Sequence, residues 1–156
     1  MRESFDKAFE IVIGLEGKPT NDPNDPGGFT IFGLSKRFNP EVHEGTTLEE
    51  AKELYLERYW KPSGADHSLY PLDICLFDGA VNPQDDPDDP GKGNREILDK
   101  HPANWYEFLM LRMVRYMENS KPGFVKGHVF RVLRLYGKIK EDIRLKQEQM
   151  LKDGGY

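Results

Sequence analysis

The amino-acid sequence predicts a mainly α-helical fold with at most a small β element. Three observations lead to this prediction: apolar residues recur at helical spacing, capping motifs precede two of those segments, and no alternating strands joined by a hairpin turn stand out. The length of 156 residues is typical of one domain. A net charge of only −5 and an aromatic content of 12% exclude a disordered chain.

The first half of the chain predicts two helices separated by a loop. Apolar spacing favours a helix over residues 4–15, with Ser4 as its N-cap. Residues 18–29 contain three prolines and two glycines, which exclude a helix. Residues 30–38 fit either a short strand or a helical turn. The sequence TLEE at 47–50 is a capping box that opens a helix to about Tyr59.

The second half predicts further helices around a second loop. The apolar run 74–81 reads as a short buried helix, and residues 83–94 form a proline-rich acidic loop. Asn104 is a candidate cap for a helix that ends at about Met117. After a break at 121–123, apolar spacing predicts another helix, and the charged sequence beyond residue 138 is compatible with its exposed continuation.

Charge is unevenly distributed along the chain. Residues 1–111 contain 11 Lys and Arg against 22 Asp and Glu, whereas residues 112–146 contain 10 against 3. One interpretation is attraction of the basic segment to a polyanion, and the other is a solvated helix face paired with the acidic body. The second is favoured, because the cations are spread over the whole segment.

Several classes of site are excluded or disfavoured. One cysteine, Cys75, excludes an internal disulfide and a cysteine-rich zinc site. The histidines lack metal-ligand spacing, so we expect no metal and no cofactor; they are His43, His67, His101 and His128. The acidic loop 85–93 does not fit an EF-hand and favours a solvated turn. We expect no transmembrane segment and no signal peptide, because no long apolar run exists and residues 1–12 are acidic and amphipathic.

Glu16, Asp25 and Thr30 lie on or beside the first Pro- and Gly-rich loop, and their side chains are of the kinds that glycosidic bond cleavage needs. That reaction needs a carboxyl of raised pKa to protonate the leaving oxygen, and a second group to stabilise the oxocarbenium charge or activate water. Glu16 follows an apolar helical turn, Asp25 lies on the Pro- and Gly-rich loop, and the Thr30 hydroxyl could hold a water. On spacing alone, a surface Glu16 and a turn-forming Asp25 explain the pattern better.

The motifs around these residues resemble those of the family 108 glycoside hydrolases, which are phage and bacterial N-acetylmuramidases. The resemblance starts with LEG at 15–17, NDPNDPGGFT at 21–30 and GL at 33–34. It continues with AKELYLERYW at 51–60, LFDGAVN at 76–82 and GFVKGHVFRV at 123–132. Lys18, Pro83, His128 and the loop 84–94 depart from the family pattern, which puts wall binding by the C-terminal half in doubt.

The resemblance implies a lysozyme-like helical domain with Glu16 as general acid. It further implies Asp25 as base or electrostatic stabiliser and Thr30 as the residue that orients water. Tyr59 and Trp60 would stack on sugar rings, or else belong to the core. Asn82 would hydrogen-bond a substrate acetamido group, or else cap the helix before it.

The expected function is hydrolysis of the β-1,4 bond between N-acetylmuramic acid and N-acetylglucosamine in peptidoglycan. The expected partner is a peptidoglycan glycan strand and not a nucleic acid, and the expected state is a monomer. The protein would lie in the host cytoplasm before release to the wall, or in a virion. Residues 1–156 would form one catalytic domain, whose part from about 95 could be a reduced peptidoglycan-binding region. The alternatives are a lytic transglycosylase and a non-catalytic virion or wall-binding module.

Overall fold

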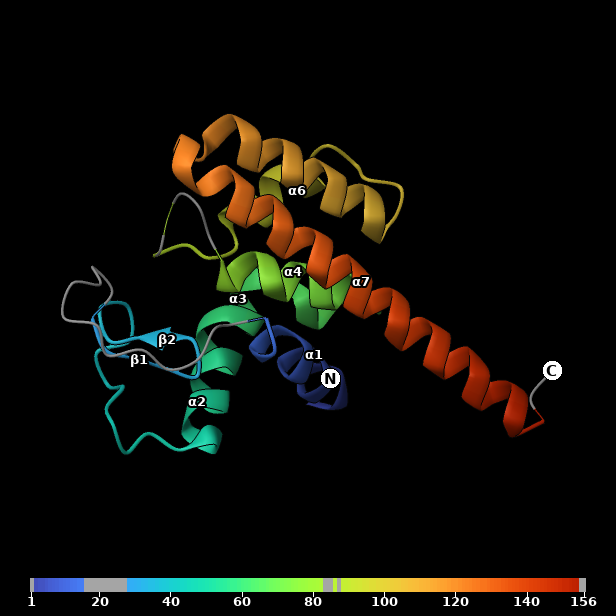
Figure 1. Ribbon diagram of the computed structural model, residues 1–156, viewed down its shortest axis with the longest axis horizontal. Coiled ribbons are helices and arrows are strands. Elements are labelled where there is room, and N and C mark those ends of the chain that lie inside the picture. Colours follow the sequence, from blue (N-terminus) through green and yellow to red (C-terminus); the bar gives the residue numbers. More distant parts are fainter. Residues whose placement is uncertain (1, 16–27, 83–85, 87, 155–156) are drawn as a thin grey trace. The chain divides into compact units, whose positions relative to one another are not determined.

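The structure is a computed structural model that describes residues 2–15, 28–82, 86 and 88–154 (Figure 1). The chain divides into two compact units, residues 1–101 and residues 102–156. The mainly α prediction is confirmed, since helices make up most of the described chain and one short hairpin is its β element.

The first unit contains a hairpin and a series of mostly short helices. In chain order, its elements are α1 (Arg2–Ile13), β1 (Thr30–Ile31), β2 (Leu34–Ser35), α2 (Leu48–Tyr55), the π-helical turn η1 (Leu56–Trp60), α3 (Lys61–Ser63), the 3₁₀ turn η2 (Ala65–His67), α4 (Leu72–Val81) and α5 (Lys92–Leu98). Helix α1 begins at Arg2, so the prediction of Ser4 as its N-cap was wrong.

An aromatic cluster forms the core of this unit. The rings of Phe5, Trp60 and Phe77 contact one another edge to face at centroid distances of 5.4 to 5.7 Å. Phe9 and Tyr55 extend the cluster, with their ring centroids 5.4 Å apart. Helix α4 is buried over most of its length, which confirms the prediction of a short buried helix.

Asn94 of α5 connects that helix to α3 and α4 by hydrogen bonds. Its side-chain amide donates to the carbonyls of Leu76, at 2.8 Å, and Ser63, at 3.2 Å. Gly79 of α4 faces this side chain, and a Cβ there would lie 2.3 Å from Asn94 Oδ1. The absence of a side chain at Gly79 therefore permits the close packing of α5 against α4.

The hairpin resolves the ambiguity of residues 30–38. Thr30 lies opposite Ser35 in an antiparallel pair, and the two turn residues, Phe32 and Gly33, have φ values of 51° and 78°. Positive φ at both positions suits the twist of a two-residue hairpin, although it is unfavourable for a phenylalanine. Tyr55 of α2 donates its hydroxyl to the Phe32 carbonyl at 2.9 Å and so holds the turn in place.

The capping box predicted at 47–50 is present. The Thr47 backbone N–H donates to Glu50 Oε2 at 2.7 Å, and the Glu50 N–H donates to Thr47 Oγ1 at 3.2 Å. The helix that it opens extends beyond Tyr59, as α2, η1 and α3 in succession. Local side-chain to backbone pairing thus determines where this segment starts, but not where it ends.

The second unit is a pair of helices, α6 (Trp105–Asn119) and α7 (Pro122–Lys152). Asn104 caps α6 as predicted, since its Oδ1 accepts from the Glu107 N–H at 2.9 Å. The rings of Trp105 and Tyr136 stack at 5.4 Å, so the two helices run antiparallel from the turn at residues 120–121. Among the described helices, none combines the length with the apolar composition that crossing a bilayer requires.

His128 occupies the packed side of this helix pair. Its ring stacks on Tyr116 at 4.8 Å, and its Nδ1 lies 2.9 Å from the Ser120 hydroxyl. Burial, followed by the charges of Arg112 and Arg131, lowers the pKa of the His128 imidazole. The position that departs from the family motif is thus a half-buried stacking residue.

Candidate active site

Two of the three predicted catalytic residues, Glu16 and Asp25, lie outside the described residues. Thr30, the third, is the first residue of β1, and its hydroxyl donates to the Gly28 carbonyl at 3.4 Å. It lies directly opposite Ser35, which lines a cavity. The structure therefore places one member of the predicted set on the hairpin beside that cavity.

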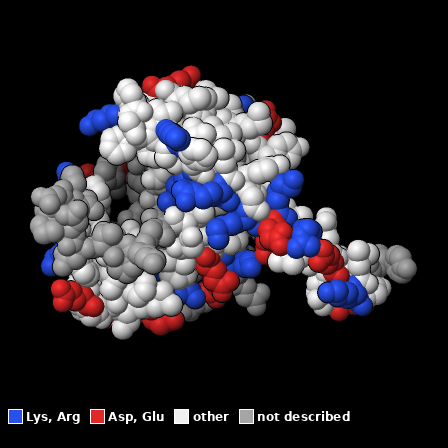
Figure 2. All heavy atoms as spheres, in the orientation of Figure 1, with Lys and Arg blue, Asp and Glu red and all other residues white. Residues whose placement is uncertain are grey.

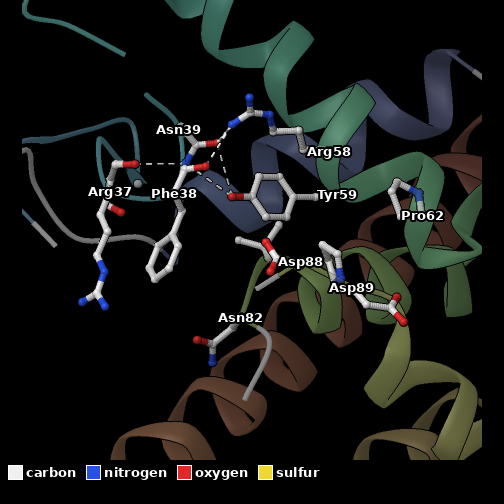
Figure 3. A pocket seen from close by; sticks show the side chains of 13 residues that line it. Arg37, Phe38, Asn39, Arg58, Tyr59, Pro62, Asn82, Asp88 and Asp89 are labelled. Atoms are coloured by element: carbon white, nitrogen blue, oxygen red, sulfur yellow. Dashed lines mark hydrogen bonds between the residues drawn. The ribbon is translucent and has the colours of Figure 1, made fainter. Parts of the chain in front are cut away.

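The cavity has a volume of about 620 Å³ and is formed by segments that are distant in sequence. Its walls come from the hairpin and the residues after it, from η1 and α3, from the end of α4, and from the acidic loop before α5. The lining residues are Gly33, Ser35, Arg37, Phe38, Asn39, Arg58, Tyr59, Pro62, Val81, Asn82, Asp88, Asp89 and Pro90 (Figure 3).

Tyr59 is held at the cavity wall by Asn39. The Asn39 side chain is 1% exposed, and its Nδ2 donates to the Ser35 carbonyl at 3.1 Å and to the Tyr59 hydroxyl at 3.4 Å. Arg58 completes the network, because its Nη1 donates to Asn39 Oδ1 at 2.9 Å and to the Phe38 carbonyl at 3.0 Å. Figure 3 shows this network on one side of the Tyr59 ring.

Trp60 does not contribute to the cavity. Its side chain is 1% exposed, it packs in the aromatic core, and its indole N–H donates to Asp66 Oδ1 at 2.5 Å. The prediction that Trp60 stacks on a sugar ring is therefore wrong, and the alternative assignment to the core is correct. Tyr59 and Trp60 are adjacent in the helical turn η1, where successive side chains point in different directions around the helix axis, so that Tyr59 lines the cavity and Trp60 lies in the core.

The position of Asn82 is compatible with both roles that the sequence left open. It is the C-cap residue of α4, where its backbone N–H donates to the Asp78 carbonyl at 3.1 Å. It also lines the cavity together with Tyr59. Two of the three predicted substrate-binding residues thus belong to one cavity.

The second acidic loop contributes two carboxylates to this cavity, which sequence reasoning did not anticipate. Asp88 and Asp89 both line it, and the loop is held by local pairing: the Asp88 N–H donates to Asp86 Oδ1 at 3.1 Å. Asp89 forms an ion pair with Arg95, and the hydrogen bond between them raises the pKa of Arg95. Arg37, Asn39 and Arg58 were missed as well, because no short-range motif distinguishes them.

The lining offers hydrogen-bond donors, acceptors and aromatic rings in one open space. Such a combination suits a ligand with hydroxyl or amide groups and apolar ring faces. Within the described ranges, no three His, Cys, Asp or Glu side chains come together in a way that could hold a metal ion.

A family model described as glycosyl hydrolase 108 matches residues 9–83, which are 75 of the 156 residues. The match covers the hairpin, η1 and α4, and thereby most of the cavity wall. The match supports the resemblance to this family that the sequence motifs indicate. No curated protein and no solved structure matches the chain significantly.

Proposed function

We propose, from the assignment to the glycosyl hydrolase 108 family, that this protein is a peptidoglycan hydrolase of the muramidase type. It cleaves the β-1,4 bond between N-acetylmuramic acid and N-acetylglucosamine, and it acts as a monomer on the glycan strand. The observation that carries the proposal is that Tyr59 and Asn82, both inside the matched segment, line one cavity beside the Thr30 hairpin. The resemblance further implies action at the cell wall, after release from the host cytoplasm or as part of a virion.

Glu16 is the proposed general acid, because its motif resembles the family's catalytic motif. Protonation of the glycosidic oxygen by a carboxyl of raised pKa lowers the barrier to departure of the leaving sugar. Asp25 then stabilises the oxocarbenium charge or activates the water, and the Thr30 hydroxyl orients that water. These three assignments derive from the motif.

Tyr59 and Asn82 are the proposed substrate contacts. The ring of Tyr59, held through its hydroxyl by Asn39, offers an apolar surface to the C–H face of a sugar. The Asn82 side chain both donates and accepts, which matches the N–H and C=O of an acetamido group. Both sugars of the glycan strand carry that group.

The test is the release of reducing ends from purified peptidoglycan by Glu16→Gln and by a matched control, Glu10→Gln. Glu10 is an exposed residue of α1, so its substitution changes the same charge on the adjacent helix. Loss of a general acid lowers the rate by about 100-fold or more. Glu16→Gln with the activity of the control would refute the assignment, provided that circular dichroism shows both variants folded.

Mass spectrometry of the products distinguishes the alternatives. Hydrolysis yields reducing N-acetylmuramic acid ends, whereas a lytic transglycosylase yields 1,6-anhydro ends. Sedimentation of the protein with peptidoglycan without the release of any ends would instead identify a wall-binding module.

A further inference from the structure

Exposed apolar side chains are concentrated in the unit 102–156. Among the described residues, 15 large hydrophobic side chains are exposed, and 11 of them belong to this smaller unit. Those 11 are Tyr106, Met110, Val114, Met117, Phe124, Phe130, Leu133, Tyr136, Leu145, Met150 and Leu151. Exposed apolar side chains mark an interaction site where several of them lie together on one face.

The same unit carries a cationic segment in the first two thirds of α7. Residues 120–140 contain six Lys and Arg and no Asp or Glu. The cations are Lys121, Lys126, Arg131, Arg134, Lys138 and Lys140. Figure 2 shows Lys and Arg side chains gathered over this part of α7 on the face that is in view.

Cations and apolar side chains lie together on one face of α7, which we call the outer face. It consists of Lys126, Phe130, Leu133, Arg134, Gly137 and Lys140, which follow one another at helical spacing and are all exposed. The inner face of the same helix is buried and apolar, with Val132, Leu135 and Ile139. The outer face is therefore a second apolar face, and core packing does not account for it.

The outer face keeps its apolar groups and its charges in contact with each other. Phe130 and Leu133 are 50% and 47% exposed, and the Lys126 ammonium lies 5.7 Å from the centroid of the Phe130 ring. A Cβ at Gly137 would meet no atom within 4 Å, so the helix surface between Leu133 and Lys140 is open to a partner.

We propose that the outer face of α7 binds peripherally to an anionic lipid bilayer. Lys126, Arg134 and Lys140 pair with lipid phosphates, while Phe130 and Leu133 enter the boundary between headgroups and acyl chains. A charged polymer in water would attract the cations and could pack on the Phe130 ring, but it offers no apolar phase that would bury Leu133. The combination of both in one face therefore favours the lipid surface.

The mode of binding follows from the composition of the helix. Since none of the described helices is suited to cross a bilayer, α7 lies along the surface with its axis in the membrane plane. Long Lys and Arg side chains reach outward to the phosphates while their apolar stems rest on the interface. The proposal does not depend on the peptidoglycan activity, and each fails or holds without the other.

The experiment is co-sedimentation of the full-length protein with vesicles of phosphatidylglycerol and, separately, of phosphatidylcholine. We expect binding to the anionic vesicles only, weakened by salt. Substitution of Lys126 and Arg134 by Gln lowers the partition coefficient about fivefold per cation. The double variant Phe130→Ser with Leu133→Ser lowers it about tenfold or more.

Matched controls come from the first unit. Leu69→Ser removes an apolar side chain that is 87% exposed, and Lys100→Gln removes an exposed cation; neither variant changes vesicle binding. Absence of wild-type binding to phosphatidylglycerol vesicles overturns the proposal whether or not any variant folds. A second result would also overturn the proposal. It is vesicle binding that the Phe130 and Leu133 substitutions leave unchanged, together with equal retention of the protein on double-stranded DNA, because that pair of findings identifies a general polyanion site.

Discussion

Replacement of Asn39 by Ala tests the network that holds the candidate site together. The Asn39 side chain is buried and connects two segments through three residues: the end of the hairpin through the Ser35 carbonyl, and η1 through Arg58 and Tyr59. Alanine removes all three hydrogen bonds and leaves the Ser35 carbonyl without this donor. The variant therefore loses stability, and the Tyr59 ring loses its positioning partner.

The magnitude follows from the individual distances. The bonds at 2.9 Å to Arg58 and 3.1 Å to the Ser35 carbonyl each contribute about 1 kcal/mol, while the long contact of 3.4 Å to Tyr59 contributes little. The free energy of unfolding of the first unit is thus expected to fall by about 2 kcal/mol. The free energy of unfolding typically decreases by ~2 kcal/mol for each molar increase in urea concentration, so the urea concentration at the midpoint of unfolding falls by about 1 M.

The two tryptophans provide a unit-specific assay, because Trp60 belongs to the first unit and Trp105 to the second. In a Trp105→Phe background, the fluorescence of Trp60 reports urea unfolding of the first unit alone. The matched control is Asn119→Ala, which removes an amide that donates to the Arg115 carbonyl at 3.1 Å in the second unit. It leaves the Trp60 transition unchanged.

A midpoint for Asn39→Ala within the error of the parent would refute the reasoning, because the network would then contribute nothing to the fold. If the proposed contact between Tyr59 and sugar holds, the same variant also raises KM on peptidoglycan more than it lowers kcat.

Three further substitutions test other parts of the structure. Tyr55→Phe removes the hydroxyl that holds the hairpin turn and costs about 1 kcal/mol in the same urea assay; an unchanged midpoint would contradict the role of that bond. Gly79→Ala displaces the Asn94 amide and lowers the thermal midpoint, at a cost of about 1–3 kcal/mol; a crystal structure with Asn94 unmoved would disprove this account. The pKa of the His128 imidazole is lowered in the folded state, so as the pH falls the unfolded chain binds this proton before the folded chain does. The free energy of unfolding therefore decreases as the pH falls below about 6.5. His128→Gln flattens that part of the pH profile, and identical profiles would exclude the effect.

Local signals made several elements of this fold predictable. The capping box at Thr47, the cap at Asn104 and the buried helix α4 are read from residues within a few positions of one another. The hairpin within residues 30–38 could not be predicted in this way, because its turn needs a positive φ at Phe32. A hydrogen bond from Tyr55, which is distant in sequence, stabilises that turn. Local preference alone disfavours that conformation.

By itself, the sequence determined the helical class, the starts of α2 and α6 and the family motif from Glu16 to Thr30, because each depends on neighbours along the chain. Only the tertiary structure decided which of the adjacent residues Tyr59 and Trp60 faces the cavity, since the side of η1 that packs against Phe5 and Phe77 is the side that carries Trp60. Only the tertiary structure, likewise, brought Asn39 and Asp88 into one wall. Burial and hydrogen bonding between segments far apart in sequence are properties of the packed chain, and no short motif encodes them.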